Sequence, residues 1–334
     1  MRRVPHWTPD PSRFPRVDLL DGPSPLRPLS RLSAALGGRA EIWIKREDLL
    51  PLAFGGNKLR NLEFLVGAAL AQSADCLVTS GRRWSNHARL TAAGGARTGL
   101  AVHLVLSGPP TDPPNPGVRL DELLGATVHQ AATDHRDERD ALIARVVSDL
   151  RAAGKRPYVI DVGGSGLPGL IGQVLAAFEL VAGSAAAGFV PDDVVVPSAT
   201  GGTHAGLLAG LATAEVATRV HGFAAARGVG DLHARIRALL DDLTGLPGIA
   251  TVPDDRIVLD DSQLGLDYGV PTAAATDATR LLATTEGILV DPIYTAKALA
   301  GLVAMTRSGQ LDGRRVVFWH AGGTPGLFEP LPTG

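Results

Sequence analysis

The sequence is poor in cysteine, in aromatic side chains and in long apolar runs, and each shortage narrows the class of protein. The single cysteine, Cys76, excludes a disulfide or a cysteine-ligated metal within one chain, and the histidines show no metal-ligand spacing. Aromatic residues make up only 4% of the 334 residues, so leucine, valine and alanine must fill the core. No apolar run is long enough to cross a bilayer.

The charge is balanced, with 32 lysines and arginines against 34 aspartates and glutamates. No long basic stripe is present, which argues against nucleic acid and anionic membranes as partners. The N-terminal segment MRRVPHWTPDPSRF is basic but has no apolar h-region, so it is not typical of a signal peptide. We therefore expect a soluble, cytoplasmic protein.

Short apolar or β-branched runs alternate with alanine-rich helical stretches. This alternation predicts an α/β fold with two domains of twisted, parallel-rich sheet covered by helices. Strands are expected at GRAEIWIKRED, Cys76–Ser80, Val102–Ser107, Tyr158–Val162, Asp193–Pro197, Arg219–Ala224, Arg256–Leu259 and Arg315–Trp319. Helices are expected at Lys58–Ala71, Asn86–Thr98, Glu138–Ala153, Gly166–Ala182, Thr203–Ala214, Gly230–Asp242, Ala273–Thr285 and Thr295–Ser308.

Lys58 is the first candidate for chemistry. It follows Gly55-Gly56-Asn57 and opens an amphipathic helix pattern, with apolar or backbone-permissive flanks that indicate an interior position. Burying an ammonium is expensive, so an interior lysine is either paired or chemically used. The used form is a Schiff base, for which a desolvated amine has a suitably lowered pKa.

Two further candidates follow predicted strands, where ligands of open α/β sheets bind. The segment Ser198–Gly206, with Thr200, Gly201, Gly202 and Thr203, is either a capped turn or an anion site at a helix N-terminus, and the upstream Lys58 favours a phosphate cup. Ser85-Asn86-His87 opens another helix. Ser85 is a good N-cap, and the functional alternative is a site for a substrate carboxylate.

Two of the three tyrosines, Tyr268 in YGVP and Tyr294 in DPIYT, occupy polar turn contexts. Each alone is more typical of an aromatic anchor that packs a loop. The turn HAGGTPG after the last expected strand completes the set of unusual segments.

Together these segments resemble the family of 1-aminocyclopropane-1-carboxylate (ACC) deaminases and D-cysteine desulfhydrases. The similarity covers nearly the whole chain, in FPRVDLLDGPSPLRPLSRLSAALGG, IWIKRED…LAFGGNKLRNLEFL, SNHARLTAA, GGTHAGLLAGL, YGVP, EGILVDPIYTAKALAGL and WHAGG. The resemblance implies pyridoxal 5'-phosphate (PLP) as cofactor, a tryptophan synthase β-like fold (fold type II), and a homodimer. It also implies a large domain formed by residues 1–55 and 165–334, and a small inserted domain formed by 56–164.

The resemblance also implies roles for the candidate residues. Lys58 would form the Schiff base, Asn86 would bind the phenolic oxygen of the cofactor, and Tyr268 and Tyr294 would frame the substrate and assist proton transfer. Ser85 would be a catalytic residue as well as a carboxylate ligand. The expected cofactor-binding residues are Lys58, Asn57, Asn86, Thr200, Gly201, Gly202, Thr203 and Thr295, and the expected substrate-binding residues are Ser85, Asn86, His87, Trp84, Arg82 and Gly164.

Two positions at which this chain differs from ACC deaminases bear on the reaction. ACC deaminases carry a glutamate where this chain has Thr295, and Ser-Asn-Gln where it has Ser85-Asn86-His87. A hydroxyl stabilises a protonated pyridine nitrogen less well than a carboxylate does, and this weaker electron sink suffices when a good β-leaving group departs. At both positions the chain resembles D-cysteine desulfhydrases, and this resemblance favours α,β-elimination.

Two departures concern the pocket. The family usually has small or neutral residues and a glutamine before Ser-Asn, where this chain has Arg82-Arg83-Trp84, and a threonine where it has Ala321. The first stretch indicates either a larger or anionic substrate or a solvated loop. We therefore expect a PLP-dependent lyase acting on a small amino acid. The alternatives are ACC ring opening, specialised β-elimination or β-replacement, and a PLP- or amino-acid-binding protein without turnover.

Overall fold

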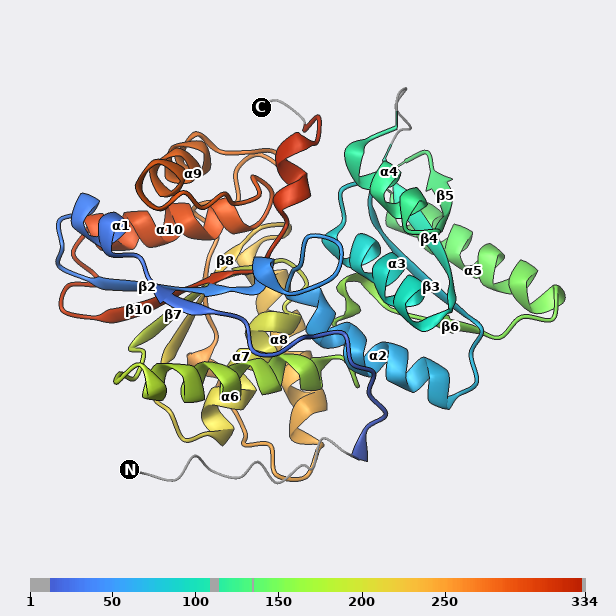
Figure 1. Ribbon diagram of the computed structural model, residues 1–334, viewed down its shortest axis with the longest axis horizontal. Helices are drawn as coiled ribbons and strands as arrows, with labels where there is room; N and C mark the ends of the chain where they lie inside the picture. The colour runs from blue at the N-terminus through green and yellow to red at the C-terminus, as the bar shows by residue number, and fades with distance from the viewer. Residues whose placement is uncertain (1–12, 109–113, 134, 332–334) are drawn as a thin grey trace.

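Two α/β units lie side by side in the computed structural model (Figure 1). The structure describes residues 13–108, 114–133 and 135–331. The N-terminal segment on which the signal-peptide prediction rests falls mainly outside these residues. Among the described helices, none is both long and apolar enough to cross a membrane.

Six strands of the described residues form the sheet of the larger unit, in the order β1-β2-β10-β7-β8-β9. Only β1 is antiparallel to its neighbour. The central strands are continuous apolar runs, as expected for strands buried on both faces. The strands are β1 (Leu26–Pro28), β2 (Glu41–Arg46), β7 (Asp193–Ser198), β8 (Arg219–Ala224), β9 (Val258–Asp260) and β10 (Arg315–His320).

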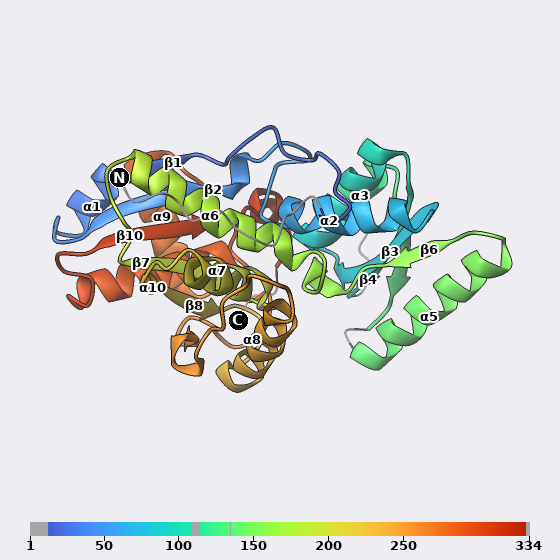
Figure 2. The same cartoon turned by 90° about the horizontal axis from the view of Figure 1, so that it is seen from below.

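Helices cover both faces of this sheet, and alternate residues of β10 enter two different cores. Val317 and Trp319 pack with α6 (Leu170–Ala186), α7 (Gly202–Thr213) and α8 (Val229–Thr244). Val316 and Phe318 pack with α1 (Ser30–Ala35), α9 (Ala273–Glu286) and α10 (Thr295–Arg307). Figure 1 shows the resulting three layers, and Figure 2 looks onto the side covered by α6, α7 and α8.

The smaller unit has a parallel sheet of four described strands in the order β5-β4-β3-β6. One core joins this sheet to α2, α3 and α4, and a smaller cluster joins it to α5 on the other face. The strands are β3 (Cys76–Arg82), β4 (Ala101–Ser107), β5 (Thr127–Ala131) and β6 (Pro157–Val159). The helices are α2 (Lys58–Ala71), α3 (Asn86–Thr98), α4 (Pro116–Leu123) and α5 (Arg136–Ala152).

The α/β fold class with two parallel-rich sheets is confirmed. The strand expected at Tyr158–Val162 ends at Val159, because a 3-10 turn follows in which Gly163 and Gly164 have φ values of 74° and 59°. The strands β1 and β5 and the helices α1 and α4 escaped the sequence analysis. All four strands of the smaller sheet lie within 56–164, and the domain boundaries themselves stay a prediction.

Candidate functional site

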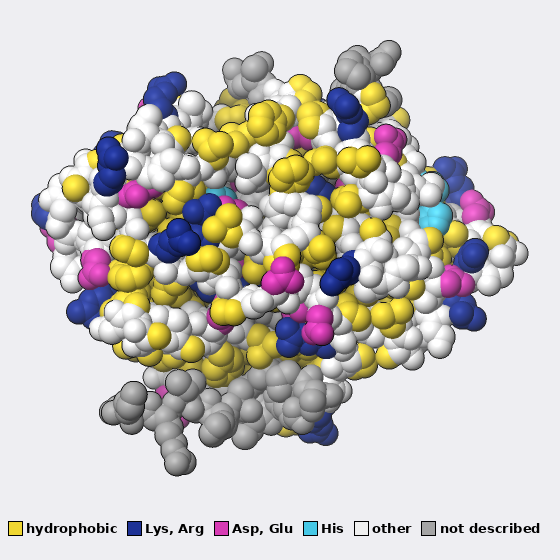
Figure 3. Space-filling view, viewed as in Figure 1, with side chains coloured by type: hydrophobic (Ala, Val, Ile, Leu, Met, Phe, Trp, Pro, Cys, Tyr) yellow, Lys and Arg dark blue, Asp and Glu magenta, His cyan; other side chains and the backbone are white. Residues whose placement is uncertain are grey.

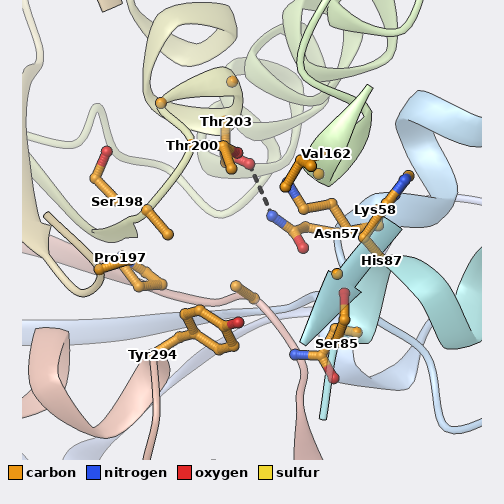
Figure 4. A pocket seen from close by; sticks show the side chains of 18 of the residues that line it. Asn57, Lys58, Ser85, His87, Val162, Pro197, Ser198, Thr200, Thr203 and Tyr294 are labelled. Atoms are coloured by element: carbon orange, nitrogen blue, oxygen red, sulfur yellow. Dashed lines mark hydrogen bonds between the residues drawn. The ribbon is translucent and has the colours of Figure 1, made fainter. Parts of the chain in front are cut away.

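A cavity of about 430 Å³ lies where the carboxyl ends of strands from both sheets face each other. Segments that follow β3, β7, β8 and β10 contribute to its wall, as expected for ligand sites of open α/β sheets. Figure 4 shows labelled side chains from the segments after β3 and β7, together with Lys58 and Tyr294, around this space. The predicted site residues that line it are Asn57, Lys58, Arg82, Ser85, Asn86, His87, Thr200, Gly201, Gly202, Thr203, Tyr268, Tyr294 and Thr295.

Lys58 is placed by a tight loop that precedes α2. Leu52, Ala53 and Phe54 all have positive φ, a conformation that costs free energy in residues with a Cβ and that clusters at functional sites. The loop then passes close to the turn after β10, because Gly56 and Gly322 pack backbone against backbone. A Cβ on Gly322 would come within 2.6 Å of the Cα of Gly56. This close approach explains why both motifs need glycine.

The surroundings of Lys58 favour the neutral form of its amine. The residue is half-buried and lines the cavity. Burial lowers the pKa of Lys58 to about 8. An amine with this pKa is partly neutral at physiological pH, which is the form that attacks a carbonyl.

A buried charge network fixes the helix that carries Lys58. Arg60, two residues further along α2, donates to Glu47 at 2.5 Å and to Glu179 at 2.8 Å. Lys45 also pairs with Glu179, and Ser24 bonds to Glu47. No role was predicted for these residues, although charged side chains between apolar positions of IWIKRED are a signal for burial with partners.

The segment after β7 has the features of an anion-binding site at the N-terminus of α7. Gly201 has a φ of 81°, which allows the chain to turn sharply into the helix at Gly202. The first N–H groups of a helix have no acceptor within it and carry partial positive charge. Thr200 bonds to the Ser165 hydroxyl at 2.6 Å. The Thr203 hydroxyl accepts from the side chain of Asn57 at 2.7 Å, the bond drawn in Figure 4.

Ser85 begins α3 as its N-cap, accepting from the backbone N–H of Ala88 at 3.2 Å. The predicted capping role is therefore confirmed. A hydroxyl that accepts in this bond keeps its own hydrogen to donate elsewhere, and Ser85 lines the cavity. Capping and ligand binding are thus compatible in one side chain.

The amide of Asn86 is oriented by Arg89. Arg89 donates to Asn86 Oδ1 at 3.0 Å, so the amide nitrogen of Asn86 remains to donate. Arg89 is buried and also donates to the carbonyl of Ala53 in the loop before Lys58. Burial lowers the pKa of Arg89 to about 10. This arginine was missed by the sequence analysis, although its place three residues after Asn86 puts both on one helix face.

His87 is neutral and presents an acceptor. Thr79 donates its hydroxyl hydrogen to the carbonyl of Ile160 at 2.7 Å, so the 2.9 Å contact between Thr79 Oγ1 and His87 Nε2 requires the histidine to donate. Nδ1 then carries no hydrogen, and it has no partner among the described residues. Burial, with the charge of Lys58, lowers the pKa of His87 to about 3. A neutral acceptor is a poor carboxylate ligand, which weakens the role predicted for His87.

Tyr268 and Tyr294 meet at the cavity wall through a hydrogen bond between their hydroxyls. Burial raises the pKa of both phenols, so both are neutral at physiological pH. The guanidinium of Arg82 lies 5.5 Å from the centre of the Tyr268 ring. The pair can therefore donate or relay a proton at the cavity surface.

Thr295 is fully buried at the start of α10 and lines the cavity. Its hydroxyl donates to the carbonyl of Gly322 at 3.1 Å. The nearby carboxylate of Asp291 is occupied, because it accepts from the backbone N–H groups of Ile293, Tyr294 and Thr295. Position 295 thus offers the cavity a hydroxyl and no carboxylate.

Trp84 and Gly164 are not among the residues that line the cavity. The ring of Trp84 is buried, 6.0 Å from that of Tyr268, and fills space against Gly269, where a Cβ would come within 2.7 Å of it. Gly164 lies behind His87 and accepts from Asn61 at 2.9 Å. Both support the site from behind, which differs from the direct contact that was predicted. Conversely, Arg136, Arg139 and Arg227 line the cavity and were not predicted to do so.

The class of protein follows from what this cavity can hold. An aldehyde that carries a phosphate would react with the Lys58 amine and seat its anion at the N-terminus of α7, and pyridoxal 5'-phosphate has this chemistry. No aspartate or glutamate stands among the described residues that line the cavity, so a phosphate meets no repulsion there. Fold and cavity define a PLP-dependent enzyme of fold type II.

Comparison with known proteins gives the particular family. The chain belongs to the pyridoxal-phosphate dependent enzyme family, whose model matches residues 17–322. It is 39% identical over 327 residues to a D-cysteine desulfhydrase of Salmonella choleraesuis (strain SC-B67), which covers 96% of this chain and 98% of the relative. A crystal structure of an ACC deaminase homologue superposes with a TM-score of 0.87 at 34% identity, covering 95% and 94% of the two chains. The fold is also that of threonine deaminase isoform 2 from Solanum lycopersicum, with a TM-score of 0.64 at 18% identity over 90% of this chain and 83% of that one.

Proposed function

We propose that this protein eliminates the β-substituent of a small amino acid, D-cysteine among the candidates, and releases a 2-oxo acid, ammonia and the leaving group. The observation that carries the proposal is the hydroxyl of Thr295 in place of a carboxylate, in a cavity that otherwise meets the needs of PLP. The D-cysteine desulfhydrase relative, similar over nearly the full length, supports the same reaction.

A few groups of the cavity carry the proposed binding of cofactor and substrate. Lys58 would hold the cofactor, the N-terminus of α7 would take its phosphate, and the amide nitrogen of Asn86 would donate to its phenolic oxygen. The bound cofactor supplies an electron sink for the pair left when the Cα–H bond breaks. Ser85 and the N-terminus of α3 bind the substrate carboxylate.

Proton transfer falls to Lys58 and the tyrosine pair. The Lys58 amine, with its pKa lowered to about 8 by burial, is the base best suited to take the Cα proton near neutral pH. The phenols of Tyr268 and Tyr294 are neutral and hydrogen-bonded, so they can protonate a departing thiolate. A tyrosine as base is the alternative, but a raised phenol pKa disfavours it.

Three other functions compete with this one. ACC ring opening is supported by the structural likeness to the ACC deaminase homologue, and β-replacement uses the same first steps. A binding protein without turnover would not need Lys58 and the paired tyrosines together in one cavity. We further propose a homodimer, on the basis of the family resemblance. We propose a cytoplasmic location because the single cysteine, Cys76, is a free and buried thiol.

The test is a substrate screen of the purified holoenzyme. D- and L-cysteine, β-chloroalanine, cysteine conjugates and ACC are compared by the release of 2-oxo acid and ammonia. Pyruvate from β-chloroalanine or a cysteine enantiomer, in excess over 2-oxobutyrate from ACC, supports elimination. Faster 2-oxobutyrate release from ACC would overturn the choice, and no oxo acid from any substrate would favour a binding protein.

A further inference from the structure

The described lining of the cavity is strongly basic, although the chain as a whole is not. Besides Lys58 it contains Arg82, Arg136, Arg139 and Arg227, which we call the arginine rim, and no aspartate or glutamate. The formal net charge of the protein is −2. On the face seen in Figure 3, basic and acidic side chains are interspersed. The rim is therefore a local concentration of positive charge that the overall charge of the chain does not account for.

The rim is assembled from both units. Arg82 ends β3, while Arg136 and Arg139 occupy the first turn of α5 after β5, on the same carboxyl edge of the smaller sheet. Arg227 follows β8 of the larger sheet. The four side chains share one cavity only because the two sheets point their carboxyl edges at each other, as ligand-binding residues do in such folds.

The anions already assigned to the cavity do not need the rim. The cofactor phosphate has the N-terminus of α7 with the Thr203 hydroxyl, and the substrate carboxylate has Ser85 and the N-terminus of α3. Guanidinium groups in the lining of such a cavity are suited to a further carboxylate, sulfonate or phosphate, which they bind through charge-assisted hydrogen bonds.

Neighbouring carboxylates neutralise three of the rim arginines, Arg136, Arg139 and Arg227, only in part. Asp140 lies 3.6 Å from Arg136 and 3.3 Å from Arg139, and Asp231 is near Arg227. The Nε atoms of Arg139 and Arg227 are buried and have no hydrogen-bond partner among the described residues. Burial, together with Arg235 and Arg136, lowers the pKa of Arg227, which indicates uncompensated positive charge. The side chain of Arg139 is 17% exposed and that of Arg136 is 78% exposed, so Arg139 should contribute more.

We propose that the arginine rim binds a second negative charge on the substrate, so that the preferred substrates are amino acids whose β-substituent is itself anionic. This inference rests on the proposed elimination and names its substrate class. For a sulfonate, the Lys58 amine takes the Cα proton, and the electron pair of the Cα–H bond forms the Cα–Cβ double bond. The Cβ–S bond breaks, its electron pair leaves with sulfur as sulfite, and the 2-aminoacrylate formed is hydrolysed to pyruvate and ammonium. A β-phosphate ester leaves as phosphate in the same way, with no oxidant or reductant.

Equilibrium binding tests the rim without turnover. Homocysteate and methionine sulfone are close in shape, lack a β-leaving group, and differ by one negative charge. Calorimetric titration of the holoenzyme with both enantiomers should show the homocysteate dissociation constant at least tenfold lower at low salt, with the advantage shrinking as salt is raised. Equal dissociation constants for the two ligands would overturn the proposal.

Variants assign the effect to residues. Arg139→Gln and Arg82→Gln should each reduce the preference for homocysteate about tenfold. Arg145→Gln, on the exposed side of α5, makes the same change of charge and should leave the preference intact. A preference that survives both rim variants, or that Arg145→Gln reduces equally, would contradict the assignment. If Arg227→Gln instead released PLP on dialysis, Arg227 would belong to the phosphate site and not to the rim.

Turnover separates this inference from the proposed function. The holoenzyme is given D- and L-cysteate and O-phosphoserine beside neutral β-chloroalanine, and pyruvate release is followed. A kcat/KM for an anionic substrate at least tenfold above that for β-chloroalanine is expected. Pyruvate from β-chloroalanine alone would overturn the rim and keep the elimination. Pyruvate from none of them, with homocysteate still preferred in titration, would overturn the elimination and keep the anion site.

Discussion

Replacing Ser85 by alanine tests whether one hydroxyl both caps a helix and binds substrate. The cap is observed, with Ser85 Oγ accepting from Ala88 N at 3.2 Å. Loss of an N-cap costs about 1 kcal/mol. An unfolding entropy of about 2.1 cal/mol/K per residue gives about 0.7 kcal/mol/K for this chain, so the melting temperature should fall by only about 1–2 °C.

The effect on catalysis should be larger. A hydrogen bond from the Ser85 hydroxyl to a carboxylate is charge-assisted and worth about 1.5–3 kcal/mol, so kcat/KM should fall roughly tenfold to hundredfold. Ser85→Gly sharpens the test, because glycine at an N-cap costs only a few tenths of a kcal/mol. It should therefore lose the same activity at almost unchanged melting temperature.

Thr272 provides the matched control. It caps α9, with Oγ1 accepting from Ala275 N at 3.1 Å, and it is not among the residues that line the cavity. Thr272→Ala should lose similar stability and keep its kcat/KM. If Ser85→Ala behaved like Thr272→Ala, with a lower melting temperature and full activity, Ser85 would be a cap and nothing more.

Three other outcomes are expected. In Lys58→Ala, borohydride should no longer fix PLP to the protein. In the wild-type apoprotein, the rate of covalent PLP attachment should rise with pH through about 8, because burial lowers the pKa of Lys58 and the neutral amine reacts. An attachment rate independent of pH between about 6 and 10 would contradict this. Arg60→Met should lower the melting temperature by roughly 4–7 °C, since removing one partner of a buried ion pair costs about 3–5 kcal/mol. A change in melting temperature below about 1 °C would show that Glu47 finds another partner. In thermal melts, Thr295→Glu should destabilise the protein more at about pH 8 than at about pH 5. The new carboxylate lies beside the buried Asp291, and the two repel each other only while both are ionised. Equal losses of melting temperature at both pH values would point to steric overlap instead.

The sequence was most informative where chemistry depends on neighbours along the chain. Lys58 at the start of a helix, the Ser85 cap and the Gly201 turn are each set by a few consecutive residues, and the structure has all three where they were predicted. The roles of these residues toward a cofactor stay predictions. Missed elements such as β1, only three residues long, depend on pairing with a distant strand, which local patterns do not encode.

Prediction was weakest where the site depends on how the two sheets pack together. Arg136 and Arg139 lie in the charged stretch RDERD, which is typical of a solvated helix face, and only the approach of the larger unit turns them toward a cavity. Trp84 could be placed behind Tyr268 only by knowing that Gly269 leaves room for its ring. His87 gave no sign of its tautomer, which is set by Thr79.

The choice of reaction and the proposed substrate class support each other through charge. The buried Asp291 carboxylate accepts from three backbone N–H groups, and Thr295 supplies only a hydroxyl, so no carboxylate among the described lining residues is free to hold a protonated pyridine nitrogen. An electron sink of this kind favours reactions in which the leaving group itself carries away negative charge. Sulfite, phosphate and thiolate all leave as anions, and a cavity whose described lining has arginines and no carboxylate stabilises that departing charge. Ring opening of ACC releases no such anion and would gain nothing from the rim.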